Sequence, residues 1–107
     1  MSNTIRSVRV FAGAVESASP EFAGTEIPAA LVLVELDRSY ECKFLFFVGG
    51  AIAMTVHAPR DQSNELRGRA SDPRGWDTEF DADLRGNRVV GTYRQPHDHG
   101  TFVLDEM

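Results

Sequence analysis

The sequence predicts a single all-β domain, an antiparallel meander of about eight strands that forms an up-and-down barrel or a strongly curled sheet. Two observations predict this fold class. Turn-forming residues recur along the chain and leave segments of about five to ten residues, which are too short for helices of average length. The clearest segment, residues 76–84, alternates strictly between apolar and acidic side chains, which is typical of a strand with one solvated face.

Composition and charge narrow the possible functions. A chain of 107 residues, 42% hydrophobic and 25% charged, is suited to one globular domain over residues 1–107. The net charge of −5 disfavours binding to nucleic acids and to anionic membranes. The longest apolar run, residues 44–54, is shorter than the roughly twenty residues of a membrane span. With one cysteine, Cys42, and no signal-peptide core, we expect a cytoplasmic protein.

The first four predicted strands are bounded by Ser19-Pro20, Asp37-Arg38-Ser39 and Gly49-Gly50. We expect these strands near residues 5–15, 28–36, 40–48 and 51–58. If Gly49-Gly50 forms a two-residue turn, both faces of the surrounding hairpin are apolar. One face then carries Leu45, Phe47, Ile52, Met54 and Val56, and the other carries Phe44, Phe46, Val48, Ala51 and Ala53.

Such a hairpin needs a cover on both faces, either another part of the domain or a second subunit. The segment 29–34 is also apolar on both faces. We therefore expect a homo-oligomer that forms through the apolar 44–56 hairpin.

The fifth and sixth strands are predicted near residues 64–70 and 76–84. A five-residue loop from Ser71 to Gly75 pairs Leu66 with Phe80, whereas a four-residue loop turns Leu66 toward water. On the outer face the five-residue loop sets two arginines opposite two acids, Arg69 with Asp77 and Arg67 with Glu79. We therefore interpret the acidic stripe as a solvated face, formed by Asp77, Glu79, Asp81 and Asp83.

The last two strands are predicted near residues 88–94 and 100–105. Gly86-Asn87 favours a two-residue hairpin turn because both residue types tolerate positive φ angles. This turn and the next loop set inward residues opposite one another: Leu84 with Val89, Ala82 with Gly91, Phe80 with Tyr93, Gly91 with Phe102, and Val89 with Leu104.

The triplet His97-Asp98-His99 is the most suggestive metal-ligand pattern. Gly91, followed by five residues and then by His97-x-His99, resembles the opening of the cupin metal motif over nine residues. Cupins place a glutamate three or four residues later, where this chain has Val103 and Leu104. We predict no metal site and no cofactor.

Two residues are candidates for acid–base chemistry. His57 lies near the end of an apolar strand, and an imidazole titrates near neutral pH. Tyr93 could act as an acid or a base in an interior pocket. No serine lies in a nucleophile elbow, and no glycine-rich phosphate loop precedes a helix.

Four aromatic residues on one predicted face could form either a filled core or the lining of an apolar pocket: Trp76, Phe80, Tyr93 and Phe102. Their surroundings, Gly75-Trp76, Gly91-Thr-Tyr93 and Gly100-Thr-Phe102-Val-Leu104, resemble the closing strands of lipocalin-like (calycin) barrels over about 30 of the 107 residues. The N-terminal glycine–tryptophan pair of lipocalins is absent. The resemblance implies an up-and-down barrel that binds an apolar small molecule.

Three functions are consistent with these features of the sequence. The first is a barrel that binds an apolar or amphipathic small molecule in its interior. The second is a cofactorless isomerase, cyclase or lyase on the same barrel. The third is a dimerising protein-interaction module with a solid core. Whether the interior is hollow or filled distinguishes the first two functions from the third.

Overall fold

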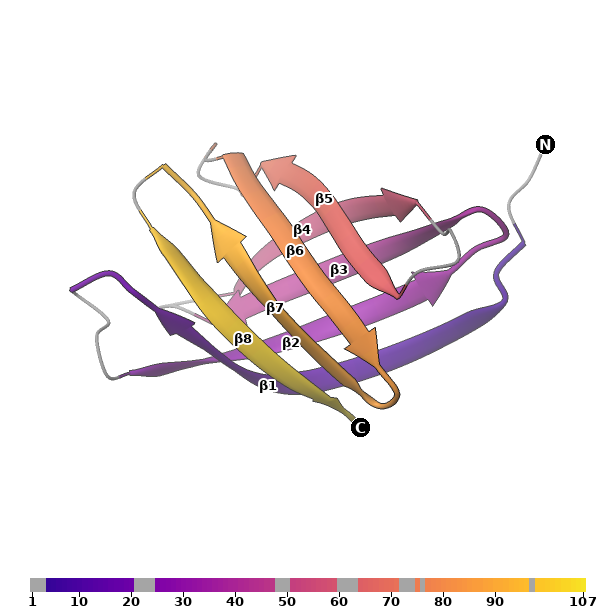
Figure 1. Ribbon diagram of the computed structural model, residues 1–107, viewed down its shortest axis with the longest axis horizontal. Helices are drawn as coiled ribbons and strands as arrows, with labels where there is room; N and C mark the ends of the chain where they lie inside the picture. Colours follow the sequence, from indigo (N-terminus) through magenta and orange to yellow (C-terminus); the bar gives the residue numbers. More distant parts are fainter. Residues whose placement is uncertain are drawn as a thin grey trace.

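In the residues that the structure describes, the chain forms eight β-strands joined as an antiparallel meander (Figure 1). The structure is a computed structural model, and it describes residues 4–20, 25–47, 51–59, 64–71, 75, 77–96 and 98–107. The strands are β1 (Ser7–Ser17), β2 (Glu26–Glu35), β3 (Ser39–Phe47), β4 (Ala51–Pro59), β5 (Glu65–Ser71), β6 (Asp77–Arg85), β7 (Arg88–Arg94) and β8 (His99–Glu106). Each strand begins and ends within two residues of its predicted position, so the predicted all-β meander is confirmed.

The strands form a nearly closed barrel. Hydrogen-bonded neighbours follow the order β4-β3-β2-β1-β8-β7-β6-β5, so the first strand pairs with the last, and β4 and β5 are the two edges of the sheet. In Figure 1, β1–β4 form the more distant layer and β5–β8 cross in front of it. The two edges meet where Gly68 of β5 approaches the backbone of His57 in β4. This boundary between β4 and β5 is termed the seam.

The predicted pairing of β6, β7 and β8 is confirmed. Phe80 lies opposite Tyr93, Ala82 opposite Gly91 and Leu84 opposite Val89 across the β6–β7 hairpin. Gly91 lies opposite Phe102 and Val89 opposite Leu104 in the next pair. At the turn only Gly86 has a positive φ angle, 65°, and Asn87 does not, which is typical of a type II′ turn.

The predicted register between β5 and β6 is wrong by two residues. Leu66 lies opposite Ala82 instead of Phe80, and Gly68 lies opposite Phe80. The connection still has five residues, but it spans 72–76. A shift of two keeps every side chain on its predicted face. In each of these two inward pairs a large residue lies opposite a small one, Leu66 opposite Ala82 and Phe80 opposite Gly68. Such pairs fill the interior evenly.

The predicted faces of the β3–β4 hairpin are also wrong. Phe44 pairs with Met54, and Leu45 pairs with Ala53, so three residues, 48–50, separate the strands. Gly49-Gly50 itself lies outside the described residues. The observed register brings Phe44, Phe46, Met54 and Val56 into the interior together. Four large side chains are thereby buried on one face, while Leu45, Phe47 and Ala53 face outward.

Candidate functional site

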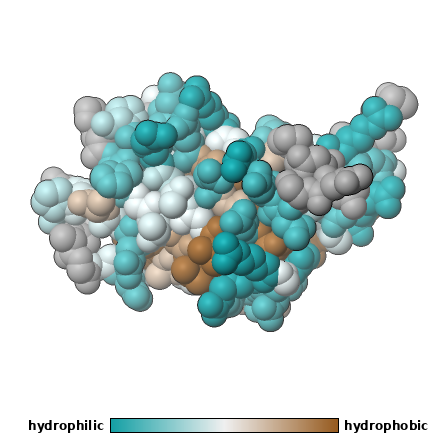
Figure 2. Space-filling view, viewed as in Figure 1, coloured by the Kyte–Doolittle hydropathy of each residue, from teal (hydrophilic) through white to brown (hydrophobic). Residues whose placement is uncertain are grey.

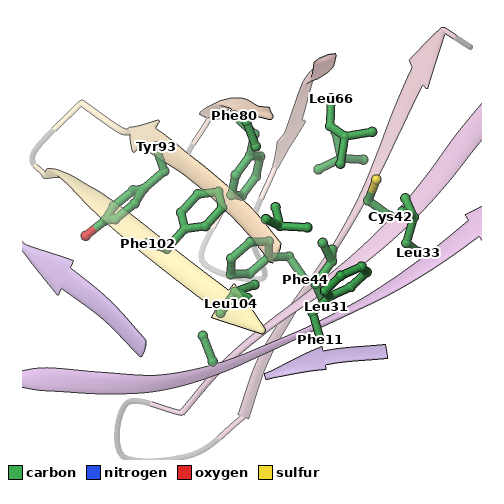
Figure 3. Packing of buried hydrophobic residues seen from close by; sticks show 14 of the residues in the cluster. Phe11, Leu31, Leu33, Cys42, Phe44, Leu66, Phe80, Tyr93, Phe102 and Leu104 are labelled. Carbon is green, nitrogen blue, oxygen red and sulfur yellow. The ribbon is translucent and has the colours of Figure 1, made fainter. Parts of the chain in front are cut away.

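The barrel interior is built around a cluster of phenylalanines (Figure 3). The ring of Phe44, in the β1–β4 layer, lies 5.2 Å from the ring of Phe80 and 4.9 Å from that of Phe102 between centroids. Phe46 lies 4.6 Å from Phe44 and 6.0 Å from Tyr93. These separations are those of directly packed aromatic rings. The two layers of the barrel are therefore joined by aromatic contacts across the interior.

One small void remains inside this core. It measures about 20 Å³, and its lining is entirely apolar apart from one thiol: Leu31, Cys42, Phe44, Val56, Leu66, Phe80, Ala82, Val89 and Phe102. A cavity that binds benzene has a volume of about 150 Å³, and one water molecule needs about 10–15 Å³. This void is thus too small for a ligand of that size. A larger ligand could enter only if lining side chains moved.

A group of hydrogen-bonded polar side chains lies at the end of the barrel near Tyr93. The Tyr93 hydroxyl donates a hydrogen bond of 2.8 Å to Asp98 Oδ2, and the Ser17 hydroxyl donates one of 2.6 Å to Asp98 Oδ1. Gln95 Nε2 donates to Thr78 Oγ1 at 2.9 Å. Burial raises the pKa of Tyr93 to about 12. Because its proton is held by Asp98 and its pKa is high, Tyr93 is a poor general acid or base near neutral pH.

An ion pair lies at the opposite end of the barrel. Arg9 donates to both carboxylate oxygens of Glu106, at 2.7 and 3.0 Å, and to the carbonyl oxygen of Gly86 at 2.6 Å. Its guanidinium also lies 5.1 Å from the ring centroid of Phe11. The hydrogen bond from Arg9 lowers the pKa of Glu106. Both ends are thus occupied by bonded polar groups.

The seam is an approach to the void from the side of the barrel. In the described part of the sheet, no ladder joins β4 to β5. Val56 of β4 and Leu66 of β5 both line the void, which therefore lies directly behind the seam. Cys42, on the neighbouring strand β3, lines it as well, and burial raises the pKa of its thiol to about 12.

The structure brings some of the predicted site residues together and separates others. Phe80, Tyr93 and Phe102 are all buried in the interior cluster. Trp76 lies outside the described residues. His57 is exposed on the outer face of β4, opposite Glu41, so it does not share a site with the buried Tyr93. The structure does not assemble the acid–base pair that the sequence suggested.

From the sequence we predicted that His97 and His99 do not form a metal site. His97 is outside the described residues, and His99 is exposed on β8. No group of three histidine, cysteine, aspartate or glutamate side chains is arranged to hold a metal in the part of the chain that the structure describes.

The outer face of β5–β7 is highly charged. Arg67 pairs with Asp81 at 3.1 Å, and Glu79 accepts from Arg69 and, at 3.4 Å, from Arg94. This arginine–acid ladder confirms that the acidic stripe is a solvated, charge-balanced face, although Arg67 and Arg69 each lie two residues further along β6 than predicted. Figure 2 shows a mostly hydrophilic surface over these strands.

The outer face of β1–β4 has the opposite character. Where side chains are described, apolar residues fill the outward positions along β1 and β2 and some of those on β3, β4 and β8. We term this surface the outer apolar face: Val8, Val10, Ala12, Ala14, Pro28, Ala30, Val32, Val34, Leu45, Phe47, Ala53 and Val103. The outward side of β3 and β4 also carries four polar or charged residues, Glu41, Lys43, Thr55 and His57. Four of its side chains remain substantially exposed: Val8 (56%), Val10 (38%), Phe47 (47%) and Val103 (44%). An apolar surface of this extent is typical of a binding site.

Sequence reasoning missed two of these features. The contact of Ser17 with Asp98 joins residues 81 positions apart, and no local pattern indicates it. The outer apolar face had a signal in the alternating apolar residues of β1 and in the doubly apolar segment 29–34. Of the side chains described in the predicted contact surface, residues 44–56, those of Leu45, Phe47 and Ala53 belong to this face.

The class of protein defined by these observations is an eight-stranded, antiparallel, up-and-down β-barrel that is nearly closed. Comparison of the chain with protein-family models, curated proteins and solved structures gave no match. Within the residues that the structure describes, no helix is long and apolar enough to cross a membrane.

Proposed function

We propose that this protein is an interaction module, a barrel with a solid core that docks another protein on its outer apolar face. The observation that carries the proposal is the contrast between its two outer surfaces. The outer face of β5–β7 consists of balanced ion pairs, whereas the outward side of β1 and β2 is apolar over four successive positions on each strand. Exposed valine and phenylalanine side chains on this face contribute nothing to the core, so a docked partner is the cover that the face lacks.

A photo-crosslinking experiment tests this function without assuming a partner. Phe47 is replaced by benzoylphenylalanine, which keeps an aromatic side chain on the outer apolar face, and the protein is irradiated inside its own cells. The matched control carries the same group at Asp81, on the charged face. We expect a discrete crosslinked product from position 47 only. Equal labelling from both positions, or none from position 47, would contradict the proposed function.

A second candidate is the binding of a small apolar molecule in the interior. The void behind the seam favours it, because its lining offers no hydrogen-bonding group other than a protonated thiol. This function would fit the interpretation of the fold as a lipocalin-like (calycin) barrel. At about 20 Å³ the void accepts only a very small molecule unless Leu66 or Val56 moves aside.

Xenon is a suitable probe for this second candidate because it enters small apolar cavities. Cys42 is the single cysteine and lines the void, so its rate of modification by methyl methanethiosulfonate reports access through the seam. Saturable slowing of this modification by dissolved xenon is expected if the void binds apolar molecules. A modification rate that is independent of xenon pressure would exclude the void as a binding site.

A further inference from the structure

We infer that β5 is a register switch: it slips along β6 by two residues, in either direction, and the slip opens the seam over the apolar void. The observed register is the closed state. This inference does not depend on docking at the outer apolar face. It also goes beyond the second candidate function, because it gives the void an entrance that exists with or without a ligand.

β5 is held less firmly than the strands around it. In the described part of the sheet it is an edge strand with a single ladder, to β6. Of its seven residues only Leu66 is buried, whereas β4, at the other edge, buries Met54, Val56 and Ala58. Its connection to β6 has five residues and fixes the register less tightly than the two-residue turn between β6 and β7. A strand held in this way can change register while the rest of the barrel stays folded.

The side-chain alternation and the outer charges of β5 survive a slip of two residues. Such a shift keeps every side chain on its face and keeps the same backbone groups directed at β6. In the observed register Arg67 lies opposite Asp81. Because the acidic stripe repeats every two residues along β6, a slip places Arg67 opposite Glu79 or Asp83. Arg69 likewise meets the next acid of the stripe. The outer ladder therefore does not select one register.

The seam, in contrast, closes only in the observed register. The residue opposite Phe80 is the one that meets β4, and in the observed register it is Gly68. A Cβ at this place would stand 2.9 Å from the carbonyl oxygen of His57. A slip brings Leu66 or Ala70 there, the two inward neighbours of Gly68, and each carries a Cβ. β5 must then move away from β4, so a slip in either direction opens the seam.

The same movement enlarges the void. In the observed register Leu66 lies opposite Ala82, and both residues line the void. A slip moves Leu66 about 6.7 Å along β6 and puts Asn64 or Gly68 in its place. Neither fills the space of a leucine, so the closed register is favoured and the open one is a minor state. An apolar molecule that occupies the space left by Leu66 would raise the population of the open register.

Disulfide trapping in the full chain tests the slip. Arg67→Cys is combined with Glu79→Cys or with Asp83→Cys, which lie two residues to either side of its observed partner. The matched controls combine Thr92→Cys with the same two changes, because Thr92 also lies opposite Asp81 but in a hairpin fixed by a two-residue turn. Under mild oxidation, one β5 pair or both should form the disulfide at least about tenfold faster than the control. Circular dichroism verifies that each variant is folded. Formation no faster than in the controls would overturn the slip.

The trapped forms then report the state of the seam through Cys42, the single native cysteine, which lies behind it. A slipped disulfide should make Cys42 react with methyl methanethiosulfonate at least about tenfold faster than in the wild type. The Arg67→Cys/Asp81→Cys disulfide, which holds the closed register, should slow the reaction at least about tenfold. The matched control is the Asp81→Cys/Thr92→Cys disulfide, which joins β6 to β7 and should slow it less. Wild-type reactivity in a slipped form, or equal slowing by the two direct disulfides, would contradict opening by slippage.

These outcomes are distinct from those that test the two candidate functions. If xenon left the Cys42 rate unchanged while a slipped disulfide raised it, the switch would stand and the void would be excluded as a binding site. Crosslinking from position 47 concerns the outer apolar face, and neither of its results bears on the register of β5.

Discussion

Gly68 of β5 lies so close to the backbone of His57 in β4 that a Cβ at position 68 would stand 2.9 Å from the His57 carbonyl oxygen and would collide with the side chain of Val56. Glycine at this position allows the two edges of the sheet to meet without a hydrogen-bonded ladder between them. The seam therefore depends on close backbone approach and on the packing of side chains behind it.

Gly68→Ala should open the seam. The added methyl group forces β5 away from β4, and overpacking of this kind costs about 1–3 kcal/mol. Cys42, which lies behind the seam, should then react with methyl methanethiosulfonate at least about tenfold faster. The reaction should proceed through a local opening of the barrel, so its rate should depend little on denaturant concentration. Unchanged Cys42 reactivity in the folded variant would show that β5 does not move.

Gly91→Ala is the matched control for this prediction. Its Cβ would lie 2.6 Å from the Asp81 carbonyl oxygen, but between β6 and β7, which are hydrogen-bonded to each other. This variant should lose stability without a separate opening at Cys42, so its labelling should follow global unfolding alone. Equal acceleration in both variants would locate the opening elsewhere than at the seam.

Phe80→Ala should destabilise the barrel by about 3–5 kcal/mol, because it removes a buried ring that packs against Phe44 and Phe102. Asp81→Ala, the next residue on the strand, removes only an exposed ion pair with Arg67 and should cost about 0.2–1 kcal/mol. Urea unfolding of the two variants measures both values. Similar losses would mean that the β6 side chains are not distributed between interior and solvent as described.

Asp98→Ala should destabilise the protein by about 1–3 kcal/mol, since it leaves the hydroxyl groups of Ser17 and Tyr93 without their common acceptor in a part-buried site. Asp98→Asn retains one carboxamide oxygen and should lose less. Tyr93→Phe combined with Asp98→Ala should cost less than the sum of the two single changes, because both remove the same hydrogen bond. Strict additivity in thermal unfolding would contradict the network.

Stability should fall on the alkaline side of neutrality. Burial raises the pKa of Cys42 from 9.0 to about 12 and that of Tyr93 from 10.0 to about 12. A raised pKa in the folded state contributes stability that is present below the unfolded pKa and is lost as pH rises toward the folded pKa. Cys42 between about pH 9 and 12, and Tyr93 between about pH 10 and 12, should each reduce the free energy of unfolding by up to about 1.4 kcal/mol per pH unit. Denaturant unfolding at several pH values measures the slope, and Cys42→Val should make it shallower between pH 9 and 10.

The parts of the fold that could be predicted were those where one pattern allowed one solution. Strict alternation in β6 and a two-residue turn at Gly86 left a single register for β6 and β7, and the structure has it. In β3 and β4 both faces are apolar, so alternation could not distinguish a two-residue connection from a three-residue one. Between β5 and β6, two registers differing by two residues place the same side chains inward.

The candidate surfaces were less predictable than the strands. The cluster of Phe80, Tyr93 and Phe102 followed from the correct register of β6 to β8. Whether these rings enclose a pocket depends on whether Phe44 and Phe46 point inward. Their direction depends on the length of the β3–β4 connection, which the sequence does not determine. The rings of Phe44 and Phe46 enter the space between the two layers, where they pack against Phe80 and Tyr93, and Phe44 lines the small void behind the seam.

The pairing of β1 with β8 has a consequence for the synthesis of the protein. Phe11 in β1 lies opposite Glu106 in β8, so the first strand finds its second neighbour only in the eighth strand. During translation, β1 can pair with β2 early, but its other edge stays unpaired until β8 has been made and has left the ribosome. Until then, the β8 side of β1 is a template for unwanted strand pairing. The barrel should therefore close in a late and slow step set by contacts distant in sequence.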